Sequence, residues 1–443
     1  MYYDLTRGSI SKSLFFFALP MMAGNLLQQF YNIADTLIVG RILGTNALAA
    51  VGSAYTLMTF LTSIFLGLSM GAGALFSIYR GKGEKEALKA AVFHAFVLIM
   101  AVTVVLNALV YLFLEPILIF LCVPAEVIEP MRQYLRIIFA GLIATSVYNF
   151  FACMLRALGN SAVPLYFLAV SAVLNIGLDL LFIIGFHWGI SGAAIATIIA
   201  QYIAGIGIML YALRGCRDIV SGWKNVPFDG QILKRIINLS ALTCLQQSVM
   251  NFGILMVQGL VNSFGSVIMA AFTAAVKIDT FAYLPVQDFG NAFSTFVAQN
   301  YGAGNEDRIR LGTKQAFKMS ILFSLVISAL VFIFATPLMG IFVDYSAQDV
   351  IAAGVRYLRI EGSFYCGIGC LFLLYGYYRA VNHAEMSVVL TVISLGLRVA
   401  LAYLFSGFIG VTGIWISIPI GWVLADIVGI LYMSVEQKRL DIS

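Results

Sequence analysis

The sequence predicts an all-α integral membrane protein. Its twelve transmembrane helices form two six-helix lobes related by a pseudo-two-fold axis along the membrane normal. Three observations support this fold class: the composition, a series of about twelve apolar stretches, and motifs that recur half a chain apart. Of the 443 residues, 61% are hydrophobic and only 11% are charged, and the mean hydropathy is +0.96. An average soluble protein has roughly 25% charged residues, so the charges here are too few to cover a soluble protein of this length.

The composition also excludes several classes of function. The net charge of +5 is small and the basic residues are scattered, so the chain lacks the basic patch of a nucleic-acid-binding protein. The six cysteines include no CxxC pair and the three histidines lie far apart, which argues against a metal or haem centre. No Walker lysine follows the glycines of the second apolar stretch. We therefore expect no cofactor, no resident metal, no nucleotide and no nucleic-acid partner.

Apolar stretches between charged or turn-rich breaks predict the spans in order, since a spanning helix uses about 20 apolar residues. The first stretch is too long for the core of a signal peptide, and its Pro20 predisposes it to a kink. The second and eighth stretches exceed 30 residues and are expected to tilt or to project beyond the bilayer. The predicted spans are residues 14–39, 47–79, 90–114, 131–155, 163–185, 190–213, 236–262, 267–300, 315–342, 354–379, 385–407 and 412–434.

The distribution of Lys and Arg predicts the orientation. With the N-terminus in the cytoplasm, 19 of the 26 basic residues fall on the cytoplasmic side and five fall outside. The remaining two, Lys277 and Arg398, lie within spans. This distribution places both termini in the cytoplasm, as an even number of spans requires. The expected location is the plasma (cell inner) membrane.

Five motifs recur in the same order with offsets of 218 to 223 residues, about half the chain. They are Leu27-Gln28-Gln29 with Leu245-Gln246-Gln247, Gly81-Lys82-Gly83 with Gly302-Ala303-Gly304, Tyr134-Leu135-Arg136-Ile137 with Tyr357-Leu358-Arg359-Ile360, Arg156-Ala157 with Arg379-Ala380, and Gly189-Ile190-Ser191-Gly192 with Gly410-Val411-Thr412-Gly413. With the polar stretch in mid-chain, they predict an N-terminal lobe (1–213), a cytoplasmic linker (214–235) and a C-terminal lobe (236–443).

The number of spans in each half determines how the halves are related. Because each half contains six spans, the second half enters the membrane in the same orientation as the first. Parallel repeats of this kind are related by an axis along the membrane normal, and a cavity is expected between the lobes. The duplication therefore predicts a transporter that works by alternating access.

Acidic residues inside the predicted spans are candidates for function, because a carboxylate within the hydrocarbon costs at least a few kcal/mol. Asp35 on the first span and Asp179 on the fifth lie about five or six residues from the outer end, and Thr197 lies about seven residues into the sixth. At about 1.5 Å per residue, all three sit roughly 8–11 Å below the outer boundary. Asn175 is one helical turn before Asp179 and shares its face.

Two carboxylates, one amide and one hydroxyl at a common depth suit a proton relay or a small hard cation such as Na⁺. The alternative is a buried polar network that only fixes helix packing. Packing is the favoured interpretation for Thr197 taken alone, whereas function is favoured for Asp35 and Asp179. The two acids are expected to titrate as a coupled pair.

The second lobe carries different charges. Its eighth span contains Lys277, Asp279 and Asp288 with Pro285 between them, and its eleventh span contains Arg398. Lys277 and Asp279 are two residues apart and do not face each other on a regular helix, so Lys277 is a candidate partner for Asp288 across a break at the proline. A structural ion pair and a cavity-lining role are alternatives for these residues.

Four stretches carry a family resemblance. They are the run Pro20…Gln28-Gln29…Asn32-Ile33-Ala34-Asp35-Thr36-Leu37-Ile38-Val39-Gly40, Asn175-Ile176-Gly177-Leu178-Asp179-Leu180-Leu181, Gly192-Ala193-Ala194-Ile195-Ala196-Thr197, and Gln299-Asn300-Tyr301-Gly302-Ala303-Gly304. They resemble the first, fifth and sixth spans and the loop after the eighth span of the multidrug and toxic compound extrusion (MATE) family. The resemblance covers nearly the whole chain.

The resemblance implies a V-shaped pair of lobes that exports amphipathic, often cationic, organic compounds in exchange for H⁺ or Na⁺. It also implies which residues form the cation-coupling site, namely Asp35, Asn175, Asp179 and Thr197. The other polar candidates, for the cavity and the C-terminal lobe, are Gln28, Gln246, Gln247, Lys277, Asp279, Asp288 and Arg398.

The C-terminal lobe departs from one pattern of the family. Some members carry a second set of carboxylates on the seventh and tenth spans. Here the seventh span has Gln246 and Gln247, and the tenth has only Glu361 near its outer start. Coupling is therefore expected to rest on the N-terminal lobe.

The sequence thus predicts a cation-coupled antiporter for small organic substrates, acting as a monomer surrounded by membrane lipid. The alternative is a flippase for lipid-linked saccharides of the same superfamily, which usually has more spans and a strongly basic cavity. An integral-membrane enzyme is disfavoured because the loops supply no convergent nucleophile, base or metal set. A passive channel is disfavoured by the duplication.

Overall fold

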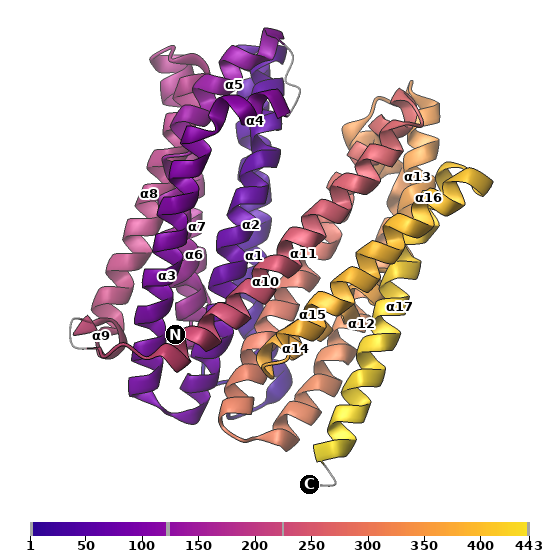
Figure 1. Cartoon of the computed structure of the whole chain (residues 1–443). Helices are drawn as coiled ribbons and strands as arrows, with labels where there is room; N and C mark the ends of the chain where they lie inside the picture. The colour runs from indigo at the N-terminus through magenta and orange to yellow at the C-terminus, as the bar shows by residue number, and fades with distance from the viewer. Residues whose placement is uncertain (1–2, 121–124, 224–225, 441–443) are drawn as a thin grey trace. The chain divides into compact units, whose positions relative to one another are not determined.

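The computed structural model describes residues 3–120, 125–223 and 226–440, and all regular elements in these ranges are helices (Figure 1). The first repeat contains α1 (Ile10–Leu43), α2 (Thr45–Lys82), α3 (Lys85–Leu112), α4 (Leu114–Phe120), α5 (Ala125–Ile138), α6 (Gly141–Ala157), α7 (Ala162–Asp179), η1 (Leu180–Gly185), α8 (Gly189–Gly215) and α9 (Arg217–Val220). The second contains α10 (Gly230–Asn262), α11 (Ser266–Gly302), α12 (Glu306–Phe342), α13 (Gln348–Gly362), α14 (Tyr365–Ala380), α15 (Ala384–Thr391), η3 (Val392–Gly396), α16 (Leu397–Ile409) and α17 (Val411–Leu440).

These helices confirm the prediction of twelve spans. Ten helical segments of the described chain are long and apolar enough to cross a membrane alone, and the bent pairs α5–α6 and α13–α14 supply two more. The pairs bend by 48° and 51° where hydropathy predicts single helices. The residues at the breaks, Phe139–Ala140 and Ser363–Phe364, include no proline or glycine, so the sequence contains no helix-breaking signal there. α1 likewise continues as one helix through Pro20.

Two of the spans contain a short π-helical stretch at corresponding places in the two repeats. η1 follows Asp179 directly in the fifth span, and η3 ends two residues before Arg398 in the eleventh. In η1 the N–H of Phe186 donates to the carbonyl of Leu181, five residues back, over 2.9 Å. π-Helical stretches are rare and frequently occur at functional sites. Both repeats therefore have irregular backbone next to a charged residue inside a span.

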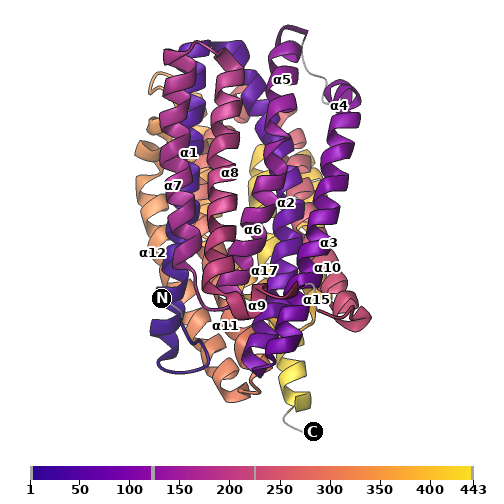
Figure 2. The ribbon, with the colours of Figure 1, turned by 90° about the vertical axis from the view of Figure 1, so that its left-hand side faces the viewer.

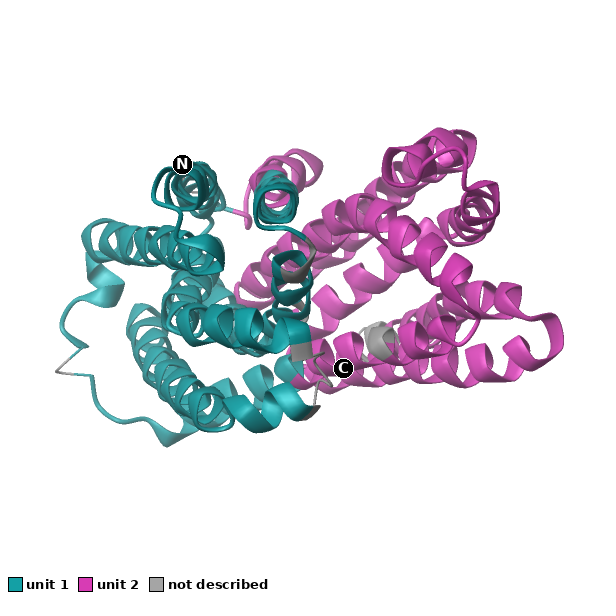
Figure 3. Ribbon diagram, turned by 90° about the horizontal axis from the view of Figure 1, so that it is seen from above, with its two compact units in different colours: residues 1–4, 23–244 teal, residues 5–22, 245–443 magenta. Residues whose placement is uncertain are grey.

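The chain folds as two compact units that do not coincide with the two repeats (Figure 3). Unit 1 comprises the start of the chain up to Asp4 and Ala23–Cys244, and unit 2 comprises Leu5–Met22 and the chain from Leu245 onward. The first part of α1 therefore packs with the second repeat, and the first part of α10 packs with the first repeat. The division at residues 213 and 235 stays a prediction about the repeats.

Close contacts hold these exchanged segments in their units. In unit 1, Ser240 Oγ donates to the carbonyl of Leu68 over 2.9 Å, and a Cβ on Gly71 would lie only 2.5 Å from Ser240 Cα. Any larger side chain at position 71 would push α2 and α10 apart, as expected where small residues bring membrane helices together. In unit 2, Arg308 donates to three main-chain carbonyls of residues 5–8.

The helices that carry the predicted coupling residues adjoin in unit 1. α7 and α8 pack side by side along their length (Figures 1 and 2). A Cβ on Gly24 would be in ordinary van der Waals contact with Leu165 and Leu168, so α1 packs against α7. This packing brings residues of the first, fifth and sixth spans to one place.

In unit 2, glycines allow α11 and α14 to approach closely. A Cβ on Gly376 would lie 2.5 Å from the carbonyl oxygen of Gly290. Gly290 is itself in close contact with the backbone of Phe372. The acidic residues of α11 are therefore held against the tenth span, which consists of α13 and α14.

Candidate functional site

The structure brings the carboxyl groups of Asp35 and Asp179 together; we call them the N-lobe acid pair. Asp35 lies on α1 and Asp179 is the last residue of α7. Their carboxyl groups lie within hydrogen-bonding reach of each other. Asp179 is fully buried, with 0% of its surface exposed. The two acids therefore form one site.

Asn175 and Thr197 adjoin the N-lobe acid pair through a short hydrogen-bond chain. Thr197 Oγ1 donates to the carbonyl of Ala193 over 3.0 Å, so its lone pairs can accept from Asn175 Nδ2 over 3.2 Å. Because Thr197 holds the amide nitrogen of Asn175, the amide oxygen is left as an acceptor. Asn175 is buried one turn before Asp179 on α7, which places this oxygen on the same face of the helix as the acid.

Four buried oxygen atoms of this site receive no hydrogen bond from the described part of the chain. They are Oδ1 of Asp35, both carboxyl oxygens of Asp179 and Oδ1 of Asn175. Each buried acceptor left without a donor costs about 1–3 kcal/mol, so such atoms are uncommon in proteins. A proton shared by the two acids, or a small cation bound by these oxygens, would satisfy them.

Two tyrosines that were not among the sequence candidates lie at the N-lobe acid pair. Tyr31, one turn before Asp35, and Tyr134 of α5 are both in the electrostatic environment of the two acids. Tyr31 is hydrogen-bonded to Gln28, so Gln28 reaches the site through this tyrosine. Tyr134 opens one of the motifs that recur in the second half of the chain, and this recurrence is the signal that points to it.

The donor set of the site limits which ion it could hold. Among the residues that the structure describes, no three His, Cys, Asp or Glu side chains are grouped to hold a metal ion. The N-lobe acid pair offers two carboxyl groups and the neutral oxygens of Asn175 and Thr197. Divalent Ca²⁺ takes 6–8 oxygen ligands, usually with several carboxylates, so this set better matches one proton or one Na⁺.

A second group of acids, which we call the C-lobe cluster, lies in unit 2. It consists of Asp279 on α11, Tyr357 and Glu361 on α13, Tyr365 on α14 and Arg398 on α16. Asp279 accepts hydrogen bonds from the hydroxyls of Tyr365 and Tyr357 and lies within hydrogen-bonding reach of Glu361. Arg398 lies close enough to Glu361 to attract its charge. Sequence patterns point to Asp279 and Arg398 but do not reveal that Glu361 is their partner.

The ion pair considered for Lys277 and Asp288 is not formed. α11 is helical throughout Ser266–Gly302, including Pro285, so these two residues are separated by about 16 Å along the axis. Lys277 instead lies over the ring of Phe342, with Nζ 5.9 Å from the ring centroid. The expected helix break at Pro285 is therefore wrong. Asp288 is buried in unit 2.

The glutamines of the seventh span, Gln246 and Gln247, are also buried in unit 2. They lie on α10 just after Cys244, where the helix passes from one unit to the other. The seventh span therefore brings amide groups into unit 2 at this level and no carboxyl group.

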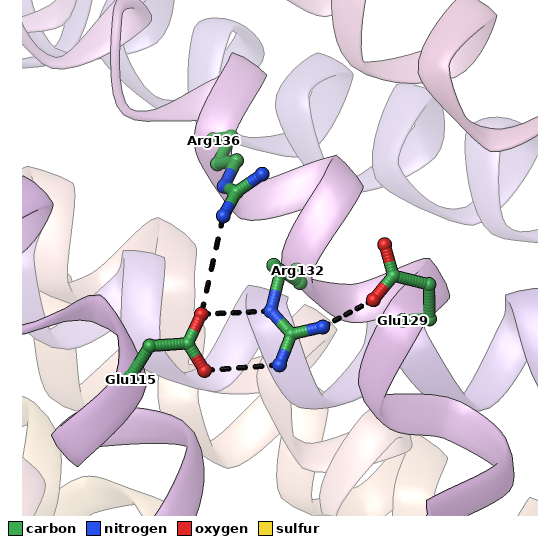
Figure 4. Close-up of polar contacts among 4 residues, drawn as sticks. All are labelled: Glu115, Glu129, Arg132 and Arg136. Atoms are coloured by element: carbon green, nitrogen blue, oxygen red, sulfur yellow. Dashed lines mark hydrogen bonds and ion pairs between the residues drawn. The ribbon is translucent and has the colours of Figure 1, made fainter.

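An exposed charge network between α4 and α5 differs from these buried groups (Figure 4). Arg132 donates to the two oxygens of Glu115 over 2.8 and 2.9 Å and also donates to Glu129, while Arg136 lies 4.0 Å from Glu115. The hydrogen bond from Arg132 lowers the pKa of the Glu115 carboxyl. Ion pairs in contact with solvent contribute little to stability, so this network joins two helices and is not a coupling site.

Comparison with known families and proteins gives consistent matches. A family model described as MatE matches residues 20–181 and 240–404. The probable multidrug resistance protein YpnP of Bacillus subtilis is 32% identical over 437 residues, which cover 97% of this chain and 96% of the relative. The probable multidrug resistance protein NorM of Thermotoga maritima is 26% identical over 426 residues, which cover 95% of this chain and 90% of the relative.

Solved structures show the same similarity in three dimensions. A MOP superfamily transporter from Pyrococcus furiosus superposes with a TM-score of 0.93 at 25% sequence identity. The superposition covers 99% of this chain and 98% of that transporter. The similarity therefore includes all twelve spans and both groups of acids.

Proposed function

Because this chain belongs to the multidrug and toxic compound extrusion (MATE) family of membrane transporters, we propose that it is a cation-coupled antiporter. In this proposal it exports amphipathic, often cationic, organic compounds in exchange for H⁺ or Na⁺. The coupling ion binds at Asp35 and Asp179, with Asn175 and Thr197 as neutral ligands or orienting groups. The chain is a transporter and not an enzyme, as its relatives are, and no cofactor takes part.

One observation carries this proposal: two buried carboxyl groups face each other without donors. Two like charges about 4 Å apart repel by about 4 kcal/mol at an effective dielectric constant of about 20. The pair therefore cannot keep both charges when empty at little cost. Binding one cation removes this repulsion and satisfies the orphaned oxygens. The site is thus suited to an ion that is loaded and released in each cycle.

Coupling requires that the loaded and empty states of the site favour different conformations. A bound ion shifts a conformational equilibrium only by its differential affinity for the two states. Asp179 directly precedes the π-helical stretch η1, and Asp35 shares α1 with Pro20. We infer that these two irregular backbone points transmit occupancy of the acid pair to the helices. The proposed transport mechanism is alternating access.

The substrate class follows from the relatives, which are named as multidrug resistance and multidrug export proteins. The chain contains 16 Met and 34 Phe residues, side chains whose adaptable packing suits promiscuous binding. The proposed location is the plasma membrane with both termini in the cytoplasm, because the basic residues are concentrated on the sides that this orientation makes cytoplasmic. A monomer is sufficient for the proposed pathway.

The decisive experiment is transport of ethidium or a fluoroquinolone in proteoliposomes with the proton gradient and the sodium gradient imposed separately. The wild-type protein should export under one of the two gradients. Asp35→Asn and Asp179→Asn should each abolish gradient-driven export, because neither variant keeps two ionisable groups at the site. Asp344→Asn makes the same change at an exposed position and should transport as the wild type does.

Three outcomes would contradict the proposal. Full gradient-dependent export by both site variants would remove the role of the acid pair. Transport that is unaffected by either gradient would indicate a passive channel. Translocation of lipid-linked saccharides without drug export would identify a flippase instead.

A further inference from the structure

The C-lobe cluster joins two buried acids and one buried guanidinium at a bend in the tenth span. Glu361 lies in the last turn of α13 and Tyr365 is the first residue of α14. The side chains that contact Asp279 therefore come from both sides of the 51° bend. Exposed fractions of 3% for Asp279, 6% for Glu361 and 8% for Arg398 show that the charges are removed from solvent.

An aromatic wall adjoins the cluster. Trp415 lies parallel to Phe272, with ring centroids 5.4 Å apart, and meets the ring of Tyr357 edge-on at 4.8 Å. All three rings are buried. Since the hydroxyl of Tyr357 bonds Asp279 and Glu361, the wall holds this donor in place and keeps water away from that side of the acids.

The internal repeat relates this cluster to the N-lobe acid pair. Tyr357 occupies the place of Tyr134 in the recurring Tyr-Leu-Arg-Ile motif, and each tyrosine lies at a pair of acids. Arg398 is 219 residues after Asp179, within the offsets of the repeated motifs, and both residues adjoin a π-helical stretch. The second repeat therefore has a guanidinium where the first has an acid, and its acids come from other helices.

The charges of the cluster can be counted. With both acids ionised, Asp279, Glu361 and Arg398 together carry one net negative charge, whereas one proton on the acids makes the group neutral. An uncompensated charge in a buried site costs several kcal/mol. Oδ2 of Asp279 and Oε2 of Glu361 receive no hydrogen bond from the described residues, so each acid has an oxygen available for a shared proton.

We propose that the C-lobe cluster is a proton-binding site separate from the N-lobe acid pair, in which Asp279 and Glu361 share one exchangeable proton and Arg398 is their fixed counter-ion. The groups that face the acids are Tyr357 of α13, Tyr365 of α14 and Arg398 of α16. Gain or loss of the proton changes the bonds to Asp279 on both sides of the bend. The site thus extends proposed ion coupling from the first repeat to the second.

The geometry favours a proton over a metal cation at this site. Tyr365 and Tyr357 direct their hydroxyl hydrogens at Asp279, and the charge of Arg398 repels a second cation. Only one oxygen of each acid is without a partner among the described residues, whereas hard metal cations such as Ca²⁺ and Mg²⁺ take six or more oxygen ligands. Two oxygens that face each other suffice for a proton.

Infrared difference spectroscopy of the purified protein during a pH titration tests this assignment without using transport. The absorption of a protonated, buried carboxylic acid should persist in the Asp35→Asn/Asp179→Asn double variant. In that background, adding Glu361→Gln or Asp279→Asn should remove it, because the remaining acid is then neutralised by Arg398 alone. Arg398→Lys should leave the band unchanged.

Arg398→Met supplies a result that a merely structural role would not produce. Without the guanidinium, neutrality requires a proton on each acid, so the carboxylic acid band should double in intensity. If Asp279→Asn does not yield folded protein, Glu361→Gln and Arg398→Met answer the same question.

Two results would overturn the assignment: a band that survives both acid substitutions, or a band that is removed by adding Na⁺ at constant pH. Loss of drug export by the wild-type protein would contradict the proposed function and leave this measurement unaffected.

Discussion

The N-lobe acid pair and the C-lobe cluster occupy corresponding places in the two repeats but are completed in different ways. In the N-lobe pair, three carboxyl oxygens of Asp35 and Asp179 have no donor within the described chain. In the C-lobe cluster, two tyrosine hydroxyls bond Asp279, and Arg398 lies near Glu361. The positive charge that must come and go in one repeat is thus part of the protein in the other. The difference teaches that duplication can preserve a buried acid pair while removing its need for an external cation.

The first helices of the two repeats differ as well. Both α1 and α10 pass from one packing unit to the other, at Met22 and Cys244 respectively. Pro20 lies two residues before the change of unit in α1, whereas α10 contains no proline. A proline removes one backbone hydrogen bond and makes a helix easier to bend. Only the helix that carries Asp35 therefore has a weakened backbone near its change of unit.

The largest effect is expected when the N-lobe pair is given the charge pattern of the C-lobe cluster. In Asp179→Arg, a fixed guanidinium would occupy the place of the exchangeable cation beside Asp35. We expect complete loss of gradient-driven export, measured as ethidium efflux from proteoliposomes. Asp344→Arg, the same substitution at an exposed position, should have no effect. Gradient-dependent export by Asp179→Arg at the wild-type rate would show that the two sites do not differ in the way proposed.

Smaller effects are expected when the neutral oxygens of the N-lobe site are removed. Asn175→Ala should weaken the apparent affinity for the coupling ion about 10-fold, the lower end of the range for groups that support ion ligands. Thr197→Val should weaken it about threefold, as for one neutral hydrogen bond of about 0.7 kcal/mol. The measurement is the transport rate as a function of pH or Na⁺ concentration.

Ser171→Ala provides a matched control for these two variants. Ser171 also bridges α7 and α8, since its Oγ donates to the carbonyl of Ala200 over 3.0 Å. Its substitution should leave ion affinity unchanged. An equal loss in all three variants would indicate that these residues only hold the helices together.

Pro20→Ala tests the difference between the first helices. Alanine restores the missing hydrogen bond and should stiffen α1, so we expect turnover to fall several-fold while ion affinity and thermal stability are maintained. The measurement is the maximal export rate at saturating gradient. Pro337→Ala in α12, where the backbone is already non-helical at Phe334, is the control and should change the rate less. Faster turnover in Pro20→Ala would contradict a hinge at this position.

The smallest effect is expected at the exposed network of Figure 4. The pKa of Glu115 is lowered by the hydrogen bond from Arg132, so its contribution to stability is present above the unfolded pKa of about 4.3. This contribution is lost as the pH falls through the lower folded pKa. Glu115→Gln should therefore be slightly less stable than the wild type at neutral pH and equally stable in acid, as measured by thermal unfolding. A difference that grows toward low pH would have the wrong sign.

The spans could be predicted from the sequence, whereas the bends within them could not. A membrane requires about 20 apolar residues in a row for each crossing, and this requirement is visible in every span. The bends of the α5–α6 and α13–α14 pairs arise at residues that are compatible with a helix, so tertiary packing produces them. The proline at position 285 shows the reverse case, since α11 continues through it.

The candidate site was only partly visible in the sequence. Depth along each helix pointed to Asp35, Asp179, Asn175 and Thr197, because position along a straight helix is a local property. It could not identify Glu361 as the partner of Asp279, since these residues lie on different helices and are joined by lateral packing. The repeated Tyr-Leu-Arg-Ile motif was a usable signal for Tyr134 and Tyr357, but the motif by itself carries no information about the acids nearby.

The sequence by itself determined the membrane class, the twelve crossings, the duplication and the family, because each depends on apolar length or on motifs within continuous stretches of chain. Only the tertiary structure decided which charged groups meet. Buried charges are compensated by whatever neighbour the packing supplies, and helices that are far apart in sequence become neighbours only when glycines and small side chains let them approach. For the same reason, Arg398 looked like an isolated charge in the sequence and is the counter-ion of an acid in the fold.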